Sequence, residues 1–369
     1  IPVFIGVLAG LHNGGLHLLW EFFSASLHPS LDPAVVKSSW RGLQITIATA
    51  LLSWVISTFG GLLLGLLSSN IFWKVFGSSE WKPILIRRLL AIPRSIHELI
   101  WGLLLLQLFG TSPWVAIVAI CIPYSSLVAR VFCDQIDSSD HRQIIALRQN
   151  GAGPLRALTT ALLPPMIPVI NSYGGYRLEC ALRGATILGV FGMGGIGSEL
   201  QLTLQSLEFQ EMWTSLWMLG AVMFSLEIFL RWWRKDRSSP NKSEKQLLIS
   251  LVVMLATIVI SILWLQKLDI DLLLNLKWHP ITLPTIGEII IAFHELPWIN
   301  LIRSTLLMTL LAAGIAIGTP PLGMMLWPTR LGKTIQSCMW SFLRLIPPPL
   351  SALLLLLCTS PSISVSALA

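Results

Sequence analysis

The chain contains few charged residues. Asp, Glu, Lys and Arg together make up 12% of its 369 residues, whereas 54% are hydrophobic. An ordinary soluble domain carries about twice that charged fraction. The composition therefore excludes an ordinary soluble domain and indicates a membrane protein.

Several signatures of enzyme chemistry are absent from the sequence. It contains no Walker A sequence, no H-E-x-x-H and no G-x-S-x-G. The five cysteines form neither a C-x-x-C pair nor a cluster with histidine, so we expect no disulfide and no metal site. We assign no catalytic residue, and an intramembrane enzyme stays open as an alternative from another function class.

Long apolar runs are what the sequence has in abundance. Eight windows are long enough to cross a hydrocarbon layer of about 30 Å as helices. They are residues 43–67, 89–110, 114–132, 162–191, 211–230, 247–265, 300–326 and 339–357. A transmembrane barrel would show short alternating segments instead. The sequence therefore predicts an all-α, polytopic transmembrane bundle of about eight membrane helices.

The net charge of +7 is distributed unevenly along the chain. Basic residues concentrate in the loops 68–88, 133–161, 231–246 and 327–335. The positive-inside rule places these loops in the cytoplasm, and the loops between them then fall outside without a conflict. The basic charge is explained by this topology, so we expect no nucleic acid as a partner.

Two parts of the chain resemble each other. Gly65 matches Gly323, and the pair Ile92-Pro93 matches Ile346-Pro347, each at nearly the same distance from Trp40 or Trp298. We therefore predict a first unit over residues 1–233, a cytoplasmic linker over 234–246 and a partial second unit over 247–369. The alternative is a chance similarity of two Leu-rich hairpins. The chain begins with Ile1 inside an apolar run, so a fragment is expected and a signal peptide cannot be judged.

The segment 145–164 reads IALRQNGAGPLRALTTALLP and has a distinctive spacing. It resembles the cytoplasmic signature of ABC importer permeases, which is EAA, three residues, Gly, nine residues, Ile, any residue and Leu-Pro. The resemblance implies two short helices around Gly151 that dock on an ATPase subunit. The docking residues would be Ala146, Leu147, Arg148, Gly151, Leu155, Arg156, Leu163 and Pro164, with Leu158 as a further anchor.

The match to this signature has one departure. Ile145 stands where the family usually has Glu, so a charged contact with the ATPase is lost. A structural alternative for the segment is an amphipathic helix that lies at the membrane interface without a partner.

Two further motifs carry a closer resemblance. RSIHELIW at 94–101 and GYRLECALRGATILGVFGMGGIG at 175–197 are similar to the permeases of phosphonate and phosphite ABC importers, with His97 in place of the usual Pro. The resemblance implies a type I importer permease in the bacterial inner membrane. Its partners would be cytoplasmic ATPase subunits, an extracytoplasmic substrate-binding protein, membrane lipid and possibly a second permease chain. ATP and Mg would bind to the ATPase, and no cofactor to this chain.

Four of the charged residues within the apolar windows are candidates for the transport pathway or for ion pairs: Arg94, Arg177, Glu179 and Arg183. Charges at this depth are costly and usually have a function or a partner. Glu179 and Arg183 are four residues apart and can pair on one helix face, whereas Arg177 lies off that face. Arg94, Arg177 and Arg183 are candidates for an anion pathway. The alternative is that these residues, with Glu179, form ion pairs that hold helices together.

The sequence GMGGIG at 192–197 matches G-x-G-x-x-G literally. We reject a dinucleotide site because no strand precedes it and the topology places it outside. Gly192, Gly194, Gly195 and Gly197 are instead expected to form a tight outer turn between two helices.

The expected function is the permease subunit of an ATP-driven importer for phosphonate, phosphite or a related oxyanion. Such a subunit performs no chemistry itself. The alternatives are an importer of another small solute and a degenerate relative that no longer transports. The anion itself is not specified by the sequence.

Overall fold

The computed structural model describes residues 10, 12, 14–77, 81–236, 243–268, 285–343, 347–359, 362 and 366. Contacts divide the chain into two compact units. Unit 1 comprises Ile1–Lys37, Glu199–Gly220 and Pro280–Ala369, and unit 2 comprises Ser38–Ser198 and Ala221–His279. The regular elements of the described residues are helices, in agreement with the predicted all-α class.

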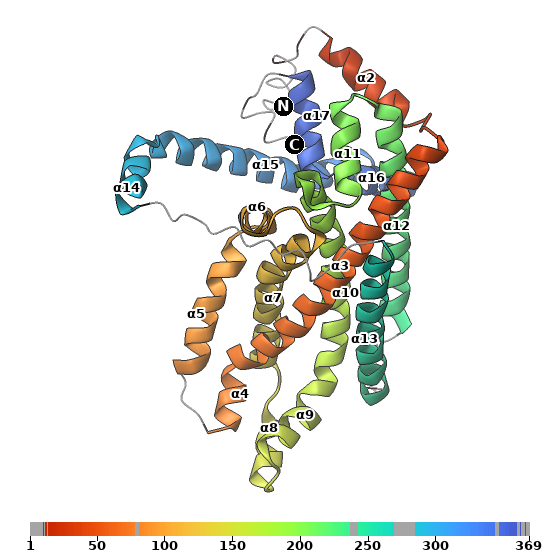
Figure 1. The fold of residues 1–369 in the computed structure, drawn as a ribbon. Coiled ribbons are helices and arrows are strands. Elements are labelled where there is room, and N and C mark those ends of the chain that lie inside the picture. Colours follow the sequence, from red (N-terminus) through yellow and green to blue (C-terminus); the bar gives the residue numbers. More distant parts are fainter. Residues whose placement is uncertain are drawn as a thin grey trace. The chain divides into compact units, whose positions relative to one another are not determined.

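The helices follow one another along the chain as Figure 1 labels them. Their bounds are α2 (Gly15–Ala25), α3 (Pro33–Ser68), α4 (Asn70–Val75), α5 (Trp81–Ser95), α6 (Glu98–Phe109), α7 (Pro113–Ser138), α8 (Arg142–Gln149), α9 (Pro154–Ala161), α10 (Leu163–Leu188), η1 (Gly189–Met193), α11 (Ile196–Gln205), α12 (Phe209–Asp236), α13 (Ser243–Lys267), α14 (Ile286–Glu295), α15 (Trp298–Leu326), α16 (Arg330–Leu343) and α17 (Pro348–Cys358).

Four helices of the described chain are long and apolar enough to cross a membrane: α3, α7, the Phe209–Trp232 part of α12, and α15. Two bent pairs raise the number to six, namely α5 with α6 and Pro164–Met193 with Ile196–Gln205. Six of the eight predicted windows therefore have a counterpart. The window 247–265 falls on α13, whose part Val252–Lys267 is apolar but shorter than the 18 residues required of a candidate span. The window 339–357 falls on two shorter helices, α16 and α17.

The predicted single span over 89–110 is wrong in one respect, because it is broken. α5 and α6 meet at an angle of 81°. His97 has extended backbone angles and caps α6, since its Nδ1 accepts a hydrogen bond from the Leu99 N–H at 3.2 Å. Pro93, in the last turn of α5, donates no backbone hydrogen bond. The break is therefore produced by local chemistry rather than by hydrophobicity.

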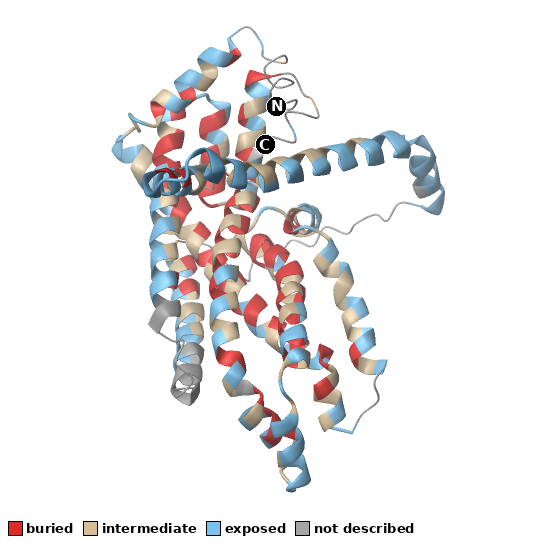
Figure 2. Cartoon of the chain, turned by 180° about the vertical axis from the view of Figure 1, so that it is seen from behind, coloured by how far each residue is buried: buried red, intermediate tan, exposed pale blue. Residues whose placement is uncertain are grey.

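α7 forms the centre of unit 2. Ile117, Ala119, Ile120 and Phe132 are all fully buried. Figure 2 colours the buried residues of the chain red. α3 packs directly against it, because Gly61 and Gly65 leave room for the α7 backbone: a Cβ atom on Gly61 would lie 2.9 Å from the Ser125 carbonyl oxygen, and one on Gly65 would lie 3.0 Å from the Ala129 carbonyl oxygen. Small residues four apart are the usual means of close helix contact in membranes.

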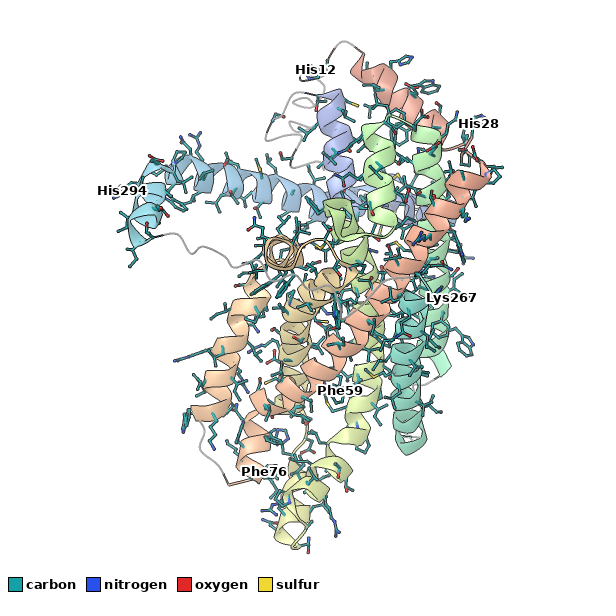
Figure 3. All side chains as sticks on the ribbon, in the orientation of Figure 1. His12, His28, Phe59, Phe76, Lys267 and His294 are labelled. Carbon is teal, nitrogen blue, oxygen red and sulfur yellow. The ribbon has the colours of Figure 1, made fainter. Side chains whose placement is uncertain are left out.

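Large apolar side chains also cover the outside of unit 2. Phe59 projects from α3 and is exposed (Figure 3). In a soluble protein such a surface would cause aggregation, whereas lipid covers it in a membrane.

Unit 1 has its own core, built from α2, α11, the beginning of α12 and α17. The Trp213 Nε1–H donates to the Phe22 carbonyl at 2.7 Å, and Phe22 and Trp213 are both fully buried. α15 has no buried residue among those described, although it is apolar over 29 residues.

Contacts within unit 2 bring together segments of loops that were predicted to share a side of the membrane. Asp137 bonds to Asn70, so the loops 68–88 and 133–161 lie at one end. A Cβ atom on Gly194 would contact Pro113 at 3.8 Å, so the part of the loop 192–210 that belongs to unit 2 meets the loop 111–113. Both pairs were predicted to share a side.

Candidate functional site

The basic segment after α7 folds as a helical hairpin. α8 ends at Gln149 and α9 begins at Pro154. Gly151 has a φ of +83°, and the N–H groups of Gly151 and Ala152 donate to the carbonyls of Arg148 and Leu147 at 3.1 and 3.0 Å. This is a Schellman motif with Gly at the left-handed position. The predicted arrangement of helix, glycine break and helix is therefore present.

The hairpin is held by apolar packing on one side. Ile144 of α8 and Ala157 and Leu158 of α9 are buried in a cluster with Ile71 and Phe132. The prediction that Leu158 offers an anchoring surface to a partner is therefore wrong, because this side chain is buried in the chain's own core. Leu147 is half-buried against the same cluster.

The opposite side of the hairpin is open. Ile145 is 54% exposed and Leu155 is 66% exposed. Arg148 and Arg156 are exposed too, as is Ala146. The Arg148 Nη1 donates to the Ala152 carbonyl at 2.8 Å, so this side chain also stabilises the turn. At the end of the segment Pro164 lies in the first turn of α10, and the side chain of Leu163 lies outside the described residues.

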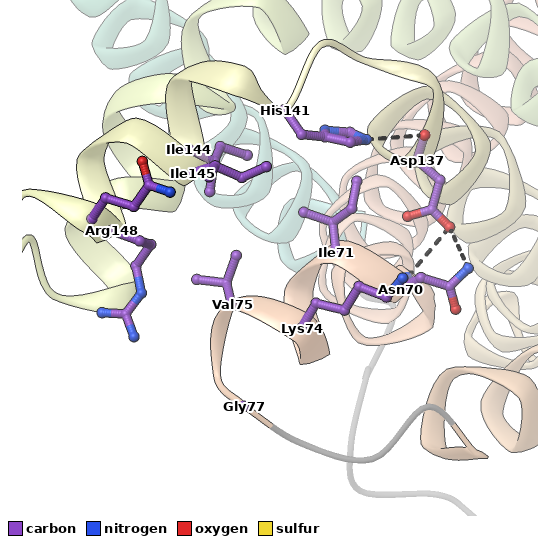
Figure 4. Close-up of a pocket in the computed structure, with 11 residues that line it drawn as sticks. Asn70, Ile71, Lys74, Val75, Gly77, Asp137, His141, Ile144, Ile145 and Arg148 are labelled. Atoms are coloured by element: carbon purple, nitrogen blue, oxygen red, sulfur yellow. Dashed lines mark hydrogen bonds between the residues drawn. The ribbon is translucent and has the colours of Figure 1, made fainter.

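The carboxylate of Asp137, in the last turn of α7, joins this helix to α4 and α5 just before the hairpin begins. Its carboxylate accepts from the Ser69 hydroxyl at 2.6 Å, from the Asn70 Nδ2 at 3.2 Å and from Arg87 of α5. His141 Nε2, just before α8, lies 3.2 Å from the Asp137 carbonyl. Figure 4 shows the bonds to Asn70 and His141. We call Asp137, Ser69, Asn70 and Arg87 the Asp137 junction.

A cavity of about 750 Å³ lies between α4 and α8 beside this junction (Figure 4). Ile71 and Val75 line it from α4, and Ile144, Ile145 and Arg148 line it from α8. The cavity therefore belongs to the same end of unit 2 as the hairpin.

The charged residues of α10 separate into two arrangements. Glu179 and Arg183 form the predicted pair, with Oε1 and Nη2 2.5 Å apart. Arg177 lies off that face, as predicted, and its Nε donates to the Tyr173 hydroxyl at 2.8 Å. Its guanidinium carbon is 5.2, 5.0 and 5.6 Å from the ring centres of Tyr124, Tyr173 and Tyr176, in the same order. Arg94, near the end of α5, is half-buried.

The glycine-rich segment forms a turn between η1 and α11, as predicted. Gly192, Gly194 and Gly195 all have positive φ. Thr46 Oγ1 of α3 accepts from the Ile196 N–H at 2.9 Å, and a Cβ atom on Gly195 would lie 2.4 Å from that oxygen. Gly197 packs against the backbone of Thr186 and Val190. The glycines thus allow close contact between the turn and α3.

The sequence matches a family model over residues 61–269, more than half of the chain, and that model describes the binding-protein-dependent transport system inner membrane component. The chain belongs to this family. Its apolar helices and the charged hairpin at one end of unit 2 agree with a membrane permease.

Curated relatives carry related names. The chain is 31% identical over 143 residues to the phosphite transport system permease protein PtxC of Stutzerimonas stutzeri, covering 39% of this chain and 52% of PtxC. It is 26% identical over 204 residues to the putative phosphite transport system permease protein HtxC of the same organism, covering 55% of this chain and 70% of HtxC. The match thus spans about half of the length of PtxC.

Solved structures show a weaker likeness. The inward-facing methionine ABC transporter MetNI is similar with a TM-score of 0.46 at 19% identity, over 55% of this chain and 96% of that one. An amino acid ABC transporter crystallised with histidines has a TM-score of 0.45 at 17% identity, over 54% and 94% of the two chains.

Sequence reasoning did not find the Asp137 junction or the tyrosine contacts of Arg177. Asp137 lies 67 residues from Asn70 in the chain, and no local pattern links them. The tyrosines gave a signal that could have been used, because the sequence contains only three of them and Tyr173 lies four residues before Arg177, which is the spacing of neighbours on a helix face.

Proposed function

We propose that this chain is the permease subunit of an ATP-driven importer of phosphonate, phosphite or a related oxyanion. Membership in the inner membrane component family supports the role in transport. The names of PtxC and HtxC support the substrate class. The observation that carries the proposal is the hairpin α8–α9, which presents an exposed surface at the basic end of unit 2.

In this proposal the chain performs no chemistry, and ATP and Mg bind to separate ATPase subunits. A substrate-binding protein delivers the anion to the outer side. The exposed residues Ile145, Arg148, Leu155 and Arg156 contact the ATPase. Closure of the ATPase moves the hairpin, and its packing against α4 and α7 passes the movement to the membrane helices, which alternate between outward and inward access. The second permease half comes either from the tandem unit predicted over residues 247–369 or from a second permease chain.

The docking role is tested with the Leu155→Asp variant in the complex of permease, ATPase and binding protein. A charge at this exposed position disturbs an apolar contact with the ATPase but not the chain's own core. We expect the variant to lose copurification of the ATPase and phosphite uptake. Phe76→Asp is the matched control, because Phe76 is also exposed at this end but lies outside the hairpin. Equal copurification in both variants contradicts the docking role.

Ile145 favours one alternative, a degenerate relative that does not transport. The usual Glu is absent there, and the exposed isoleucine offers no charge to a partner. A complex that assembles and hydrolyses ATP, yet imports none of phosphite, methylphosphonate or phosphate, would support this alternative. A complex that imports another small solute would support the second alternative, an importer of a different substrate.

A further inference from the structure

All three tyrosines of the chain surround one arginine. The sequence contains three tyrosines in 369 residues. Their ring centres lie 5.0 to 5.6 Å from the guanidinium carbon of Arg177. Tyr124 comes from α7, and Tyr173, Tyr176 and Arg177 lie on one face of α10 at positions three and four apart. We call these four residues the Arg177 cluster.

The charge of Arg177 is not compensated by a carboxylate in the described part of the chain. Glu179, the nearest acidic residue in sequence, bonds to Arg183. Glu98 accepts from the Tyr124 hydroxyl at 3.2 Å and contacts His97 at 3.4 Å. Arg177 itself has hydrogen bonds only to the Tyr173 hydroxyl among the described residues, through Nε and Nη2. Its Nη1 group is available to another acceptor.

A cation at membrane depth is costly, and its partner is commonly a counter-charge or a substrate. The tyrosine rings stabilise the guanidinium through their faces, and the Tyr173 hydroxyl takes up Nε and one N–H of Nη2, which leaves the Nη1/Nη2 edge of the guanidinium for another acceptor. A guanidinium held in this way presents a planar fork of N–H groups, which suits two oxygens of an oxyanion. Tyr176 is 53% exposed, so the cluster is accessible from one side.

We propose that the Arg177 cluster binds the phosphoryl group of the substrate at membrane depth. Arg177 supplies the charge and the free N–H donors, Tyr173 fixes the guanidinium, and Tyr124 and Tyr176 enclose it. The ligand class is a phosphorus oxyanion with at least one negative charge. This inference rests on the proposed function and narrows the three candidate arginines of the anion pathway to Arg177. Arg183 is paired with Glu179, and the tyrosines that surround a guanidinium in the described part of the chain are those at Arg177.

Binding is measured on the purified full chain in lipid nanodiscs, with phosphite as the probe and phosphorus-31 NMR line broadening as the signal. We expect Arg177→Gln to weaken binding at least about tenfold, because charge-assisted hydrogen bonds are lost. Arg177→Lys keeps the charge but not the fork, so a smaller loss is expected. Arg130→Gln is the matched control, since Arg130 lies on α7 and pairs with Asp134, and we expect its affinity to stay within about twofold of the original.

Tyr173→Phe removes the hydroxyl that positions Arg177 but keeps the ring. We expect phosphite binding to weaken about threefold, because the guanidinium is less well pre-organised. This variant and Arg177→Lys decide the question if Arg177→Gln does not fold. Affinities of all Arg177 and Tyr173 variants equal to that of the original chain overturn the proposal, and so does an original chain that binds no phosphite.

Uptake by the complete complex separates this site from the proposed function. An original complex that imports phosphite, with an unchanged KM in Arg177→Gln, overturns the site but leaves the function. Phosphite binding that depends on Arg177 in a complex without uptake supports the site and contradicts the importer. Acetate and methylphosphonate are compared as competitors of bound phosphite, which shows whether the cluster selects phosphorus oxyanions. If acetate displaces phosphite at the same concentration as methylphosphonate does, the proposed ligand class is overturned.

Discussion

Removal of the Asp137 carboxylate is expected to destabilise unit 2 more than removal of any exposed carboxylate on the same helix. Asp137 is 21% exposed and Arg87 26%, so water screens their contact only in part. Hydrogen bonds to a charged group contribute on the order of 1.5 kcal/mol or more each. The two shortest contacts are those with Arg87 and the Ser69 hydroxyl. Their loss in Asp137→Ala is therefore expected to lower the free energy of unfolding by about 3 kcal/mol.

Asp134→Ala is the matched control for this prediction. Asp134 lies one turn earlier on α7, pairs with Arg130 at 2.8 Å and is 53% exposed. Exposed ion pairs contribute about 0 to 1 kcal/mol. The measurement is the midpoint of thermal unfolding of the purified chain in detergent. At roughly 2 °C per kcal/mol for a chain of this size, we expect a loss of about 6 °C for Asp137→Ala and about 2 °C or less for Asp134→Ala.

A double-mutant cycle with Arg87→Gln tests whether the contact itself is responsible. The two substitutions share one interaction, so their effects should differ from additivity by more than about 0.5 kcal/mol. Additive effects, or equal losses for Asp137→Ala and Asp134→Ala, would refute the reasoning. In the complete complex we further expect Asp137→Ala to reduce uptake more than ATP hydrolysis, because the hairpin is then less firmly joined to α5.

Three further outcomes follow from the structure. Gly151→Ala should lower the free energy of unfolding by about 1 to 2 kcal/mol, because Gly151 has a φ of +83°, which is unfavourable for Ala, although no atom lies within 4 Å of the added Cβ. The midpoint of thermal unfolding should fall by a few degrees, and an unchanged midpoint contradicts the left-handed turn. Ile145→Glu should increase the amount of ATPase that copurifies, since it restores the family's usual charge at an exposed position; a decrease would show that the isoleucine makes the contact. Gly195→Ala should be more damaging than Gly192→Ala when thermal midpoints are compared, because only the former places a Cβ 2.4 Å from Thr46 Oγ1; equal losses would contradict the close contact.

Much of this architecture follows from the sequence, because hydrophobic length and charge asymmetry act over whole segments. The windows 43–67 and 114–132 became α3 and α7, and the basic loops 68–88 and 133–161 meet at one end. The helical hairpin was also predictable, since a Gly at the left-handed position ends a helix by local geometry. The bend at His97 was missed because the apolar window continues through it.

The contacts of the candidate sites were less accessible to sequence reasoning. The pair of Glu179 and Arg183 was predicted because both lie on one helix face. Asp137 was not singled out, because its partners come from α4 and α5 and are brought near only by tertiary packing. Leu158 was assigned to the wrong side of the hairpin, since a short helix with apolar residues does not indicate which of them face its own protein.

The Asp137 junction and the Arg177 cluster lie at the two ends of one continuous set of contacts within unit 2. Arg87 fixes α5 to Asp137, and α5 ends at the bend where His97 caps α6. Glu98, the first residue of α6, accepts from Tyr124, whose ring contacts Arg177. Movement of the hairpin must therefore either break the bonds of Asp137 or carry α5 with it. Because residues between α5 and α6 are not helical, the joint can absorb that rotation, as hinges do. We therefore expect a rotation of α6 that follows the hairpin to change the contact between Glu98 and Tyr124, and with it the environment of Arg177, which is proposed to hold the anion.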